Sequence, residues 1–301
     1  METTATSFQF PELPDILKPF HEKIFGFLNK PMVLAIPQDT LAVLPWQSKI
    51  GGYPYLPKGV SNPLLDKYED TYYHKYMLLL QLNLQEISHL PDFPTKGILQ
   101  FFATGEPEDC DDGKGDTKII YYPESLENID ALETDFSNLP PKMYTPYFGF
   151  LDTPDEGVAI NFLPMAFSLT DSGYQFNSDI ETLFDDVDEE LWEFVQDTFS
   201  AYLEIELKES YRAWLKMQSF KIPSRVIQIG GNVYQFFSRD RREIDNDGVV
   251  YDQLLMEYVC TEEDTKYGLP LKGYDAVPQF FINSRNLKAQ EFSDYLYNCM
   301  F

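Results

Sequence analysis

Two short motifs recur in this chain at one constant spacing, which constrains the fold more than any other sequence feature. Ile50-Gly51-Gly52 reappears as Ile229-Gly230-Gly231. Gln100-Phe101-Phe102 reappears as Gln279-Phe280-Phe281. The offset is 179 positions in both cases. A repeat at a fixed offset predicts two copies of one structural unit.

The segments between these motifs also correspond. Tyr55 and Tyr234 keep the 179-residue offset, whereas the strand-like runs Leu78-Leu79-Leu80 and Leu254-Leu255-Met256 are 176 residues apart. A three-residue insertion or deletion therefore separates the copies at this point. Each copy contains a Gly-Gly pair, which permits positive φ angles and a tight turn into antiparallel strands.

We therefore expect an α+β fold made of two related lobes of mainly antiparallel sheet, with flanking and connecting helices. The lobes are expected at approximately 30–168 and 221–301, and a helical segment, 178–218, joins them. The whole chain, 1–301, is expected to form one domain, a length compatible with a single large core.

Hydrophobic periodicity places the individual elements. Helices are expected at 14–28, along the connecting segment and at about 287–298. In the connecting segment, a helical stripe of apolar side chains consists of Leu191, Phe194, Val195, Phe199, Tyr202, Leu203, Leu207, Tyr211, Trp214 and Leu215. Strands are expected at 32–36, 76–84, 97–103, 118–122, 157–168, 226–237, 251–259 and 277–282. Many Pro and Gly residues predict a loop over 45–63, which is ordered if its aromatic residues pack.

Charge excludes several classes of partner. The chain has 23 Lys and Arg residues against 49 Asp and Glu residues, a formal net charge of −26. Such a chain repels phosphate backbones and anionic lipids, so neither nucleic acid nor a membrane is expected as a partner. A hydrophobic content of 44% argues against disorder.

The cysteines and the N-terminus bear on the compartment. Cys110, Cys260 and Cys299 are odd in number and far apart, so they indicate no disulfide framework. The first ten residues resemble no signal peptide, and no apolar run approaches the ~20 residues that span a bilayer. A cytoplasmic location is the expectation.

Three segments carry a resemblance to a known family. They are Ser48 to Pro57 (SKIGGYPYLP), Leu79 to Leu84 (LLQLNL) and Gly97 to Phe102 (GILQFF). In order and spacing they resemble the signature of the bacterial YwqG-like family. The resemblance implies an internally duplicated α+β domain of unknown function. It also implies a link to immunity proteins encoded beside polymorphic toxins, and it supplies no catalytic residues.

No catalytic or metal-binding motif is present. The three histidines, His21, His74 and His89, form no H-x-x-x-H pair, and the sequence has no C-x-x-C pair and no glycine-centred serine elbow. Neither Gly-Gly motif fits a phosphate-binding loop. We therefore predict no metal site and no cofactor.

The first functional hypothesis is a non-enzymatic binding protein for a basic protein partner, such as an immunity-type toxin inhibitor. Acidic surfaces accelerate association with basic partners by long-range steering. The expected contact face lies on the connecting helix, and its acidic residues are Glu189, Glu190, Glu193, Asp197, Glu204 and Glu206. The oligomeric state is not predicted.

Two alternatives concern the repeat loops. One is a carbohydrate-active hydrolase that uses acidic residues near the 45–63 loop, since paired carboxylates perform glycoside hydrolysis. The other is a small-ligand binding module with a pocket between the lobes. The residues of the structural repeat loops, which such a pocket would use, are Trp46, Gly51, Gly52, Tyr53, Tyr55, Gly230, Gly231 and Tyr234.

Overall fold

The structure is a computed structural model of the chain. It describes residues 8–68, 71–87, 90–104, 117–140, 156–168, 183–217, 226–232, 250–259 and 277–300.

Ten strands form one continuous sheet in which every strand pair is antiparallel. The order across it is β12-β11-β10-β9-β1-β8-β2-β5-β6-β7. The strands are β1 (Met32–Leu41), β2 (Lys49–Ile50), β5 (Tyr76–Asn83), β6 (Ile98–Thr104), β7 (Thr117–Tyr122), β8 (Val158–Met165), β9 (Val226–Gly230), β10 (Gln253–Val259), β11 (Val277–Ile282) and β12 (Leu296–Met300). A separate hairpin pairs β3 (Leu65–Tyr68) with β4 (Thr71–His74).

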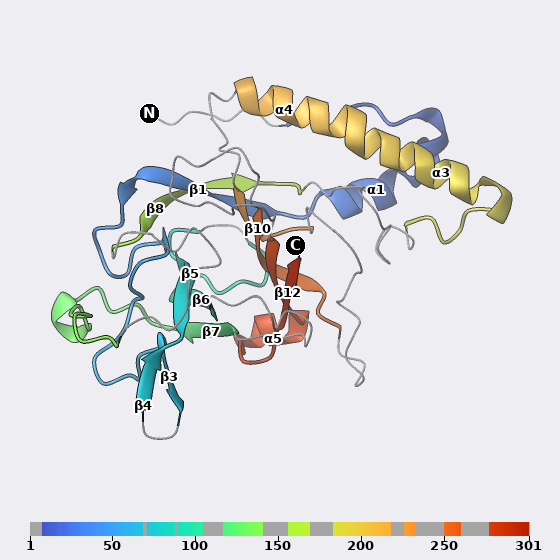
Figure 1. Cartoon of the computed structure of the whole chain (residues 1–301). Helices are drawn as coiled ribbons and strands as arrows, with labels where there is room; N and C mark the ends of the chain where they lie inside the picture. Colours follow the sequence, from blue (N-terminus) through green and yellow to red (C-terminus); the bar gives the residue numbers. More distant parts are fainter. Residues whose placement is uncertain are drawn as a thin grey trace.

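The sheet curls until its two edge strands approach each other, so it is nearly closed and barrel-like (Figure 1). Thr117 in β7 lies 3.1 Å from the hydroxyl of Tyr295, just before β12. The rings of Phe101 and Phe280 meet edge to face at 5.2 Å. Strands from both ends of the chain therefore enclose one hydrophobic core, because closing a sheet buries one face without a second layer.

The two predicted lobes thus share a single sheet, both contribute to the core that it encloses, and the described residues do not form two separate lobes. The strands run in matching order on either side of the central β1–β8 pair: β2-β5-β6-β7 on one side and β9-β10-β11-β12 on the other. The β5–β6 register shifts between Leu78 and Leu80, and the β10–β11 register shifts between Leu254 and Met256.

Helices cover one face of β1 and β8. A 3₁₀ turn (Asp15–Phe20) leads into α1 (His21–Leu28), as the periodicity of 14–28 predicts. The connecting segment contains α3 (Glu189–Ala201), a π-helical stretch (Tyr202–Leu207) and α4 (Lys208–Met217), drawn in Figure 1 as one long rod above the sheet. Their apolar side chains form a second core with β1 and β8.

Two helical predictions are wrong in part. The chain forms only a short helix, α5 (Ser284–Ala289), where 287–298 was expected to be helical. Gln290 adopts a left-handed conformation with φ 61°, which ends the helix, and the chain then pairs with β11 as β12. Leu191 and Phe194 are also exposed rather than buried, because only the later part of the predicted stripe faces the sheet.

Several predicted features lie outside the described residues. They include Tyr234, Cys110, Cys260, His89 and most of the strand predicted over 226–237 beyond β9. No helix within the described ranges is both long and apolar enough to cross a membrane.

A candidate pocket beside the first Gly-Gly turn

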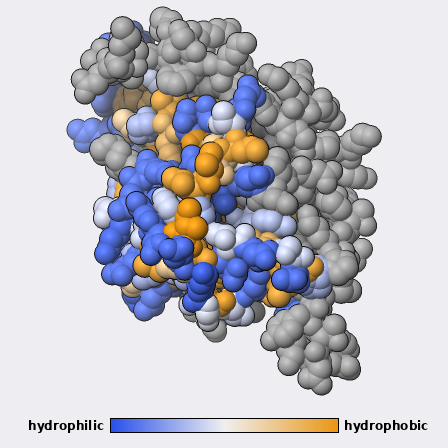
Figure 2. All heavy atoms as spheres, turned by 90° about the vertical axis from the view of Figure 1, so that its left-hand side faces the viewer, coloured by the Kyte–Doolittle hydropathy of each residue, from blue (hydrophilic) through white to orange (hydrophobic). Residues whose placement is uncertain are grey.

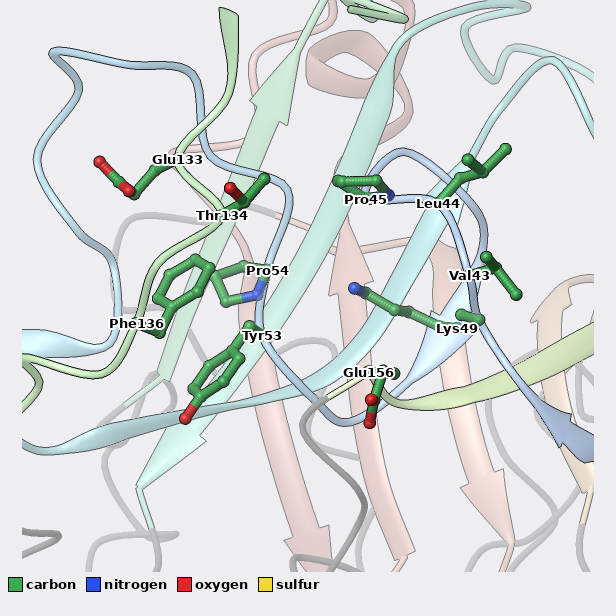
Figure 3. Close-up of a pocket in the computed structure, with 11 residues that line it drawn as sticks. Val43, Leu44, Pro45, Lys49, Tyr53, Pro54, Glu133, Thr134, Phe136 and Glu156 are labelled. Carbon is green, nitrogen blue, oxygen red and sulfur yellow. The ribbon is translucent and has the colours of Figure 1, made fainter. Parts of the chain in front are cut away.

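A pocket of about 270 Å³ opens beside β2 (Figure 3). Four stretches of chain build its walls: the end of β1, the β2 loop, the segment after a short 3₁₀ turn (Ile129–Ala131), and the residue before Gly157. The lining residues are Ala42, Val43, Leu44, Pro45, Lys49, Tyr53, Pro54, Glu133, Thr134, Phe136 and Glu156.

Two buried glutamines hold the loop that forms one wall. Gln81 Nε2 donates to the carbonyl oxygens of Pro45 and Gln47 at 2.7 and 2.8 Å, and its Oε1 accepts from the Tyr55 amide at 2.7 Å. Gln100 Nε2 donates to the Tyr55 carbonyl at 2.9 Å and to Gln81 Oε1 at 2.8 Å. A proline-rich loop has few amides for a β-ladder, so side chains satisfy its polar backbone instead.

The Gly-Gly turn brings the loop against the start of β8. Gly51 and Gly52 have φ angles of 64° and 74°. A Cβ on Gly52 would lie 2.4 Å from the Gly157 amide nitrogen, closer than real Cβ contacts come. Glycine is therefore required here for both conformation and space. The packing also places Glu156 at the pocket.

Lys49 is the unusual residue of the pocket. Its neighbour Ile50 enters the sheet core, so strand alternation points Lys49 to the opposite face. The residue is only 4% exposed, and no hydrogen bond or ion pair joins its ammonium to any described residue. Burial lowers the pKa of Lys49 to about 8, although the Glu156 carboxylate partly opposes this shift.

Apolar groups and carboxylates surround the ammonium. The Tyr53 and Phe136 rings stack at 4.3 Å with an interplanar angle of 11°. Val43 is 83% exposed at the rim. The face shown in Figure 2 exposes hydrophobic side chains among hydrophilic ones. Glu133 is half-buried and Glu156 is exposed, so neither has the buried setting of a carboxylic general acid.

The first repeat loop contributes to this pocket only in part. Tyr53 lines it, whereas Trp46 packs against the cluster of Tyr55, Ile98 and Leu132. Tyr55 is fully buried, and its hydroxyl accepts from the Leu126 amide at 2.8 Å. Burial is the main cause of the raised pKa of Tyr55. The ring therefore anchors the loop rather than facing a ligand.

The second Gly-Gly turn lies far from the first. Gly51 follows Ile50, which pairs with Val158 at the start of β8, whereas Gly230 pairs with Met32. Met32 in turn pairs with Met165 at the opposite end of β8. Gly230 and Gly231 have φ angles of 69° and 78°, and a Cβ on Gly231 would contact Met32 and Ser168. The structure does not bring the two turns together in one pocket.

The predicted acidic face lies along α3 and the π-helical stretch. Five of its acidic residues are exposed: Glu189, Glu190, Glu193, Asp197 and Glu206. The Glu204 side chain lies outside the described set. Large apolar side chains are exposed among these acids, with Leu191 at 52%, Phe194 at 60% and Ile205 at 64%. Within the described part of the chain, no three His, Cys, Asp or Glu side chains gather as metal ligands do.

Sequence reasoning missed the charged residues of the pocket: Lys49, Glu133 and Glu156. A lysine directly before the buried Ile50-Gly51-Gly52 turn was the available signal, because a charged residue within a strand core needs an explanation. No sequence pattern places Glu133 or Glu156 beside it, since tertiary packing brings them together.

Comparison with known proteins supplies a family but no activity. No curated protein matches this chain significantly. The model of a family described as a domain of unknown function, DUF1963, matches residues 48–300, which include both Gly-Gly turns and the pocket residues from Lys49 onward. The chain therefore belongs to the DUF1963 family.

Proposed function

We propose that this protein is a non-enzymatic binding protein that recognises a basic, amphipathic segment of a partner protein through the exposed side of α3. The observation behind this proposal is the mixture of exposed large apolar side chains and unpaired carboxylates on one helix. Exposed apolar groups surrounded by polar residues mark interaction sites on soluble proteins.

The apolar part of this surface consists of Leu191, Trp192 and Phe194. These side chains are 52%, 37% and 60% exposed. Leu191 and Phe194 are three residues apart, so they project from the same side of the helix. Tryptophan is among the residues in which binding energy concentrates at protein interfaces.

The acidic part of this surface has no cationic partner in the part of the chain that the structure describes. Among the described residues, no ion pair involves Glu189, Glu190 or Glu193. The positive end of the helix dipole favours acids in the first turn, which accounts for Glu189 and Glu190 as stabilisers of α3. It does not account for the exposed Leu191 and Phe194. A basic amphipathic segment would satisfy both the acids and the apolar groups.

A binding titration with a synthetic Leu/Lys amphipathic helical peptide tests this function, with a Leu/Glu peptide of the same pattern as comparison. We expect saturable binding of the Leu/Lys peptide that weakens with salt, and a blue shift of tryptophan emission as Trp192 is covered. Equal binding of the two peptides, or no binding of either, would contradict the proposal.

Two sets of substitutions locate the binding surface. Replacing Glu189, Glu190 and Glu193 by Gln is expected to weaken the Leu/Lys complex roughly tenfold at low salt, mainly through the association rate. The matched control replaces three other exposed acids, Glu124 and Glu127 by Gln and Asp130 by Asn. If this control weakens binding as much, the effect is due to net charge and not to α3.

We infer that the two halves of the sheet descend from an internal duplication. The matching strand order and the register shifts beside Leu79 and Leu255 support this inference. The YwqG-like assignment within the family, the cytoplasmic location and the immunity-type role are parts of this proposal that rest on sequence alone.

A further inference from the structure

We propose that the pocket beside β2 is a binding site for a small organic monocarboxylate, whose carboxylate lies against the Lys49 ammonium and whose apolar body lies against Tyr53, Pro54 and Phe136. The site is separate from the α3 surface and shares none of its residues. Figure 3 shows the Lys49 side chain extending into the space between these walls.

The first argument is the unpartnered ammonium. A lysine that is 4% exposed and has neither an ion pair nor a hydrogen bond to a described residue is rare in folded proteins, because charged groups are costly to bury alone. Lys49 pairs across the sheet with Gln81. An anion in the pocket would supply the counter-charge that no described residue provides by a hydrogen bond or an ion pair.

The second half of the sheet offers a comparison. In the first half of the sheet Lys49 pairs with Gln81, and Gln81 pairs with Gln100. In the second half Gln228 pairs with Glu257, and Glu257 pairs with Gln279. Gln228 therefore occupies the position that corresponds to Lys49. The Gln228 amide donates to the carbonyl oxygens of Gly230 and Asn232, so that position is satisfied from within the chain. The fold therefore does not require a lysine at this point of the pattern.

The third argument is the composition of the walls. The stacked rings of Tyr53 and Phe136, together with Pro45 and Pro54, provide an apolar surface for a flat organic group. The volume of about 270 Å³ suits a small molecule of one ring.

The two rim carboxylates restrict the charge of the ligand. Glu133 and Glu156 both line the pocket, and the Glu156 carboxylate is the one whose charge acts on Lys49, so a second negative charge on the ligand would be repelled. A ligand with a single carboxylate is therefore favoured over a dicarboxylate or inorganic phosphate.

Calorimetric and NMR titrations of the full chain with phenylacetate test the proposal. Phenylacetamide has the same shape without the charge, and succinate and inorganic phosphate supply other anions. We expect saturable phenylacetate binding, at least tenfold weaker binding of the other three, and weaker phenylacetate binding as the pH rises past about 8. Phosphate binding as tight as that of phenylacetate, or no saturation by roughly 10 mM phenylacetate, overturns the proposal.

Substitution of Lys49 locates the site. Lys49→Met is expected to abolish phenylacetate binding, whereas Lys96→Met, the same change at an exposed lysine, leaves it unchanged. A thermal melt of each variant shows whether the protein is folded. If Lys49→Met is folded and still binds phenylacetate as the parent does, the ligand lies elsewhere and the proposal fails. If that variant does not fold, Glu156→Gln tests the same site, since relief of repulsion should tighten succinate binding.

Discussion

At the scale of single residues, the burial of Lys49 opposes folding, because the charged ammonium loses its hydration. Its pKa of about 8 compares with an ordinary value of 10.5. This difference corresponds to a destabilisation of the folded state on the order of 3 kcal/mol. Strand alternation explains why the side chain is buried on the face opposite Ile50, but only tertiary packing removes its water.

The first prediction concerns the pH dependence of stability. Below about pH 8 Lys49 is charged in both the folded and the unfolded chain, so the folded state bears the full desolvation penalty. Between pH 8 and 10.5 only the unfolded chain keeps the proton, so the contribution of Lys49 to stability becomes less unfavourable as pH rises. Urea unfolding should show Lys49→Met more stable than the parent by up to about 3 kcal/mol at pH 7.

The advantage of Lys49→Met should shrink as the pH rises from 8 and should approach zero only above pH 10.5, where the lysine loses its proton in the unfolded chain as well. Lys96→Met is the control, because Lys96 is exposed and its substitution should change stability little at any pH. A constant difference between Lys49→Met and the parent across this pH range would show that desolvation of the charge is not the cause.

The second prediction distinguishes two costs of replacing a turn glycine by alanine: the strain of a positive φ angle and the steric clash of the added Cβ. Gly52 and Gly59 have similar φ angles, 74° and 83°, but only Gly52 faces another backbone segment where a Cβ would be. Gly59→Ala should cost about 1 kcal/mol from its positive φ. Gly52→Ala should cost roughly 2 kcal/mol more, because β8 must move. Equal losses in denaturant unfolding would mean that the contact with Gly157 gives way easily.

At the scale of elements, the Pro45 to Pro57 loop shows how irregular chain becomes ordered. Gln81 in β5 and Gln100 in β6 satisfy three loop carbonyls and one loop amide. The apolar runs in the sequence predict the two strands β5 and β6 that carry these glutamines. The sequence does not predict the hydrogen bonds of the glutamines, since they join residues 26 to 45 positions apart that meet only after the strands pair.

The third prediction tests this anchoring. Gln81→Met keeps the side-chain length but leaves buried loop groups without partners, so unfolding should become easier by about 3 kcal/mol. Amide hydrogen exchange at Tyr55 should also accelerate, because its acceptor is lost. Gln85→Met is the matched control at an exposed position. Unchanged Tyr55 exchange in Gln81→Met would show that the loop is held by its aromatic packing instead.

The helical segment shows a second limit of periodicity. The sequence predicted one continuous apolar stripe from Leu191 onward, and the described structure buries it only from Val195. The π-helical stretch, Tyr202–Leu207, widens one turn and keeps Tyr202, Leu203 and Leu207 on the sheet side. The apolar side chains at the start of α3 are exposed, whereas those from Val195 onward are packed in the core with β1 and β8. The periodicity of the sequence does not show which part of the stripe is buried.

At the scale of the whole molecule, the repulsion between acidic residues opposes folding, and the core of the nearly closed sheet favours it. Forty-nine acids against 23 bases leave at least 26 acids without a one-to-one partner. Self-repulsion of this size destabilises a compact chain. The closed sheet opposes that repulsion with a continuous core to which both halves contribute.

The fourth prediction follows from this balance. Raising NaCl from about 0.01 M to about 0.15 M shortens the screening length from roughly 30 Å to 8 Å, so the urea midpoint of unfolding should rise. KCl should act like NaCl, because screening depends on ionic strength and not on ion identity. A midpoint that falls with salt would show that attractive ion pairs outweigh the repulsion.

The sequence by itself determined the antiparallel strands, the two Gly-Gly turns and the excess of acids, because these depend on alternation, glycine conformation and composition. Only the tertiary structure decided that both halves join one nearly closed sheet, that the last predicted helix becomes β12 in its second half, and that Lys49 shares a pocket with Glu133 and Glu156. Local patterns specify which face of a strand is apolar. They do not specify which distant strand completes the sheet, since that choice depends on pairing and core packing between residues far apart in the chain.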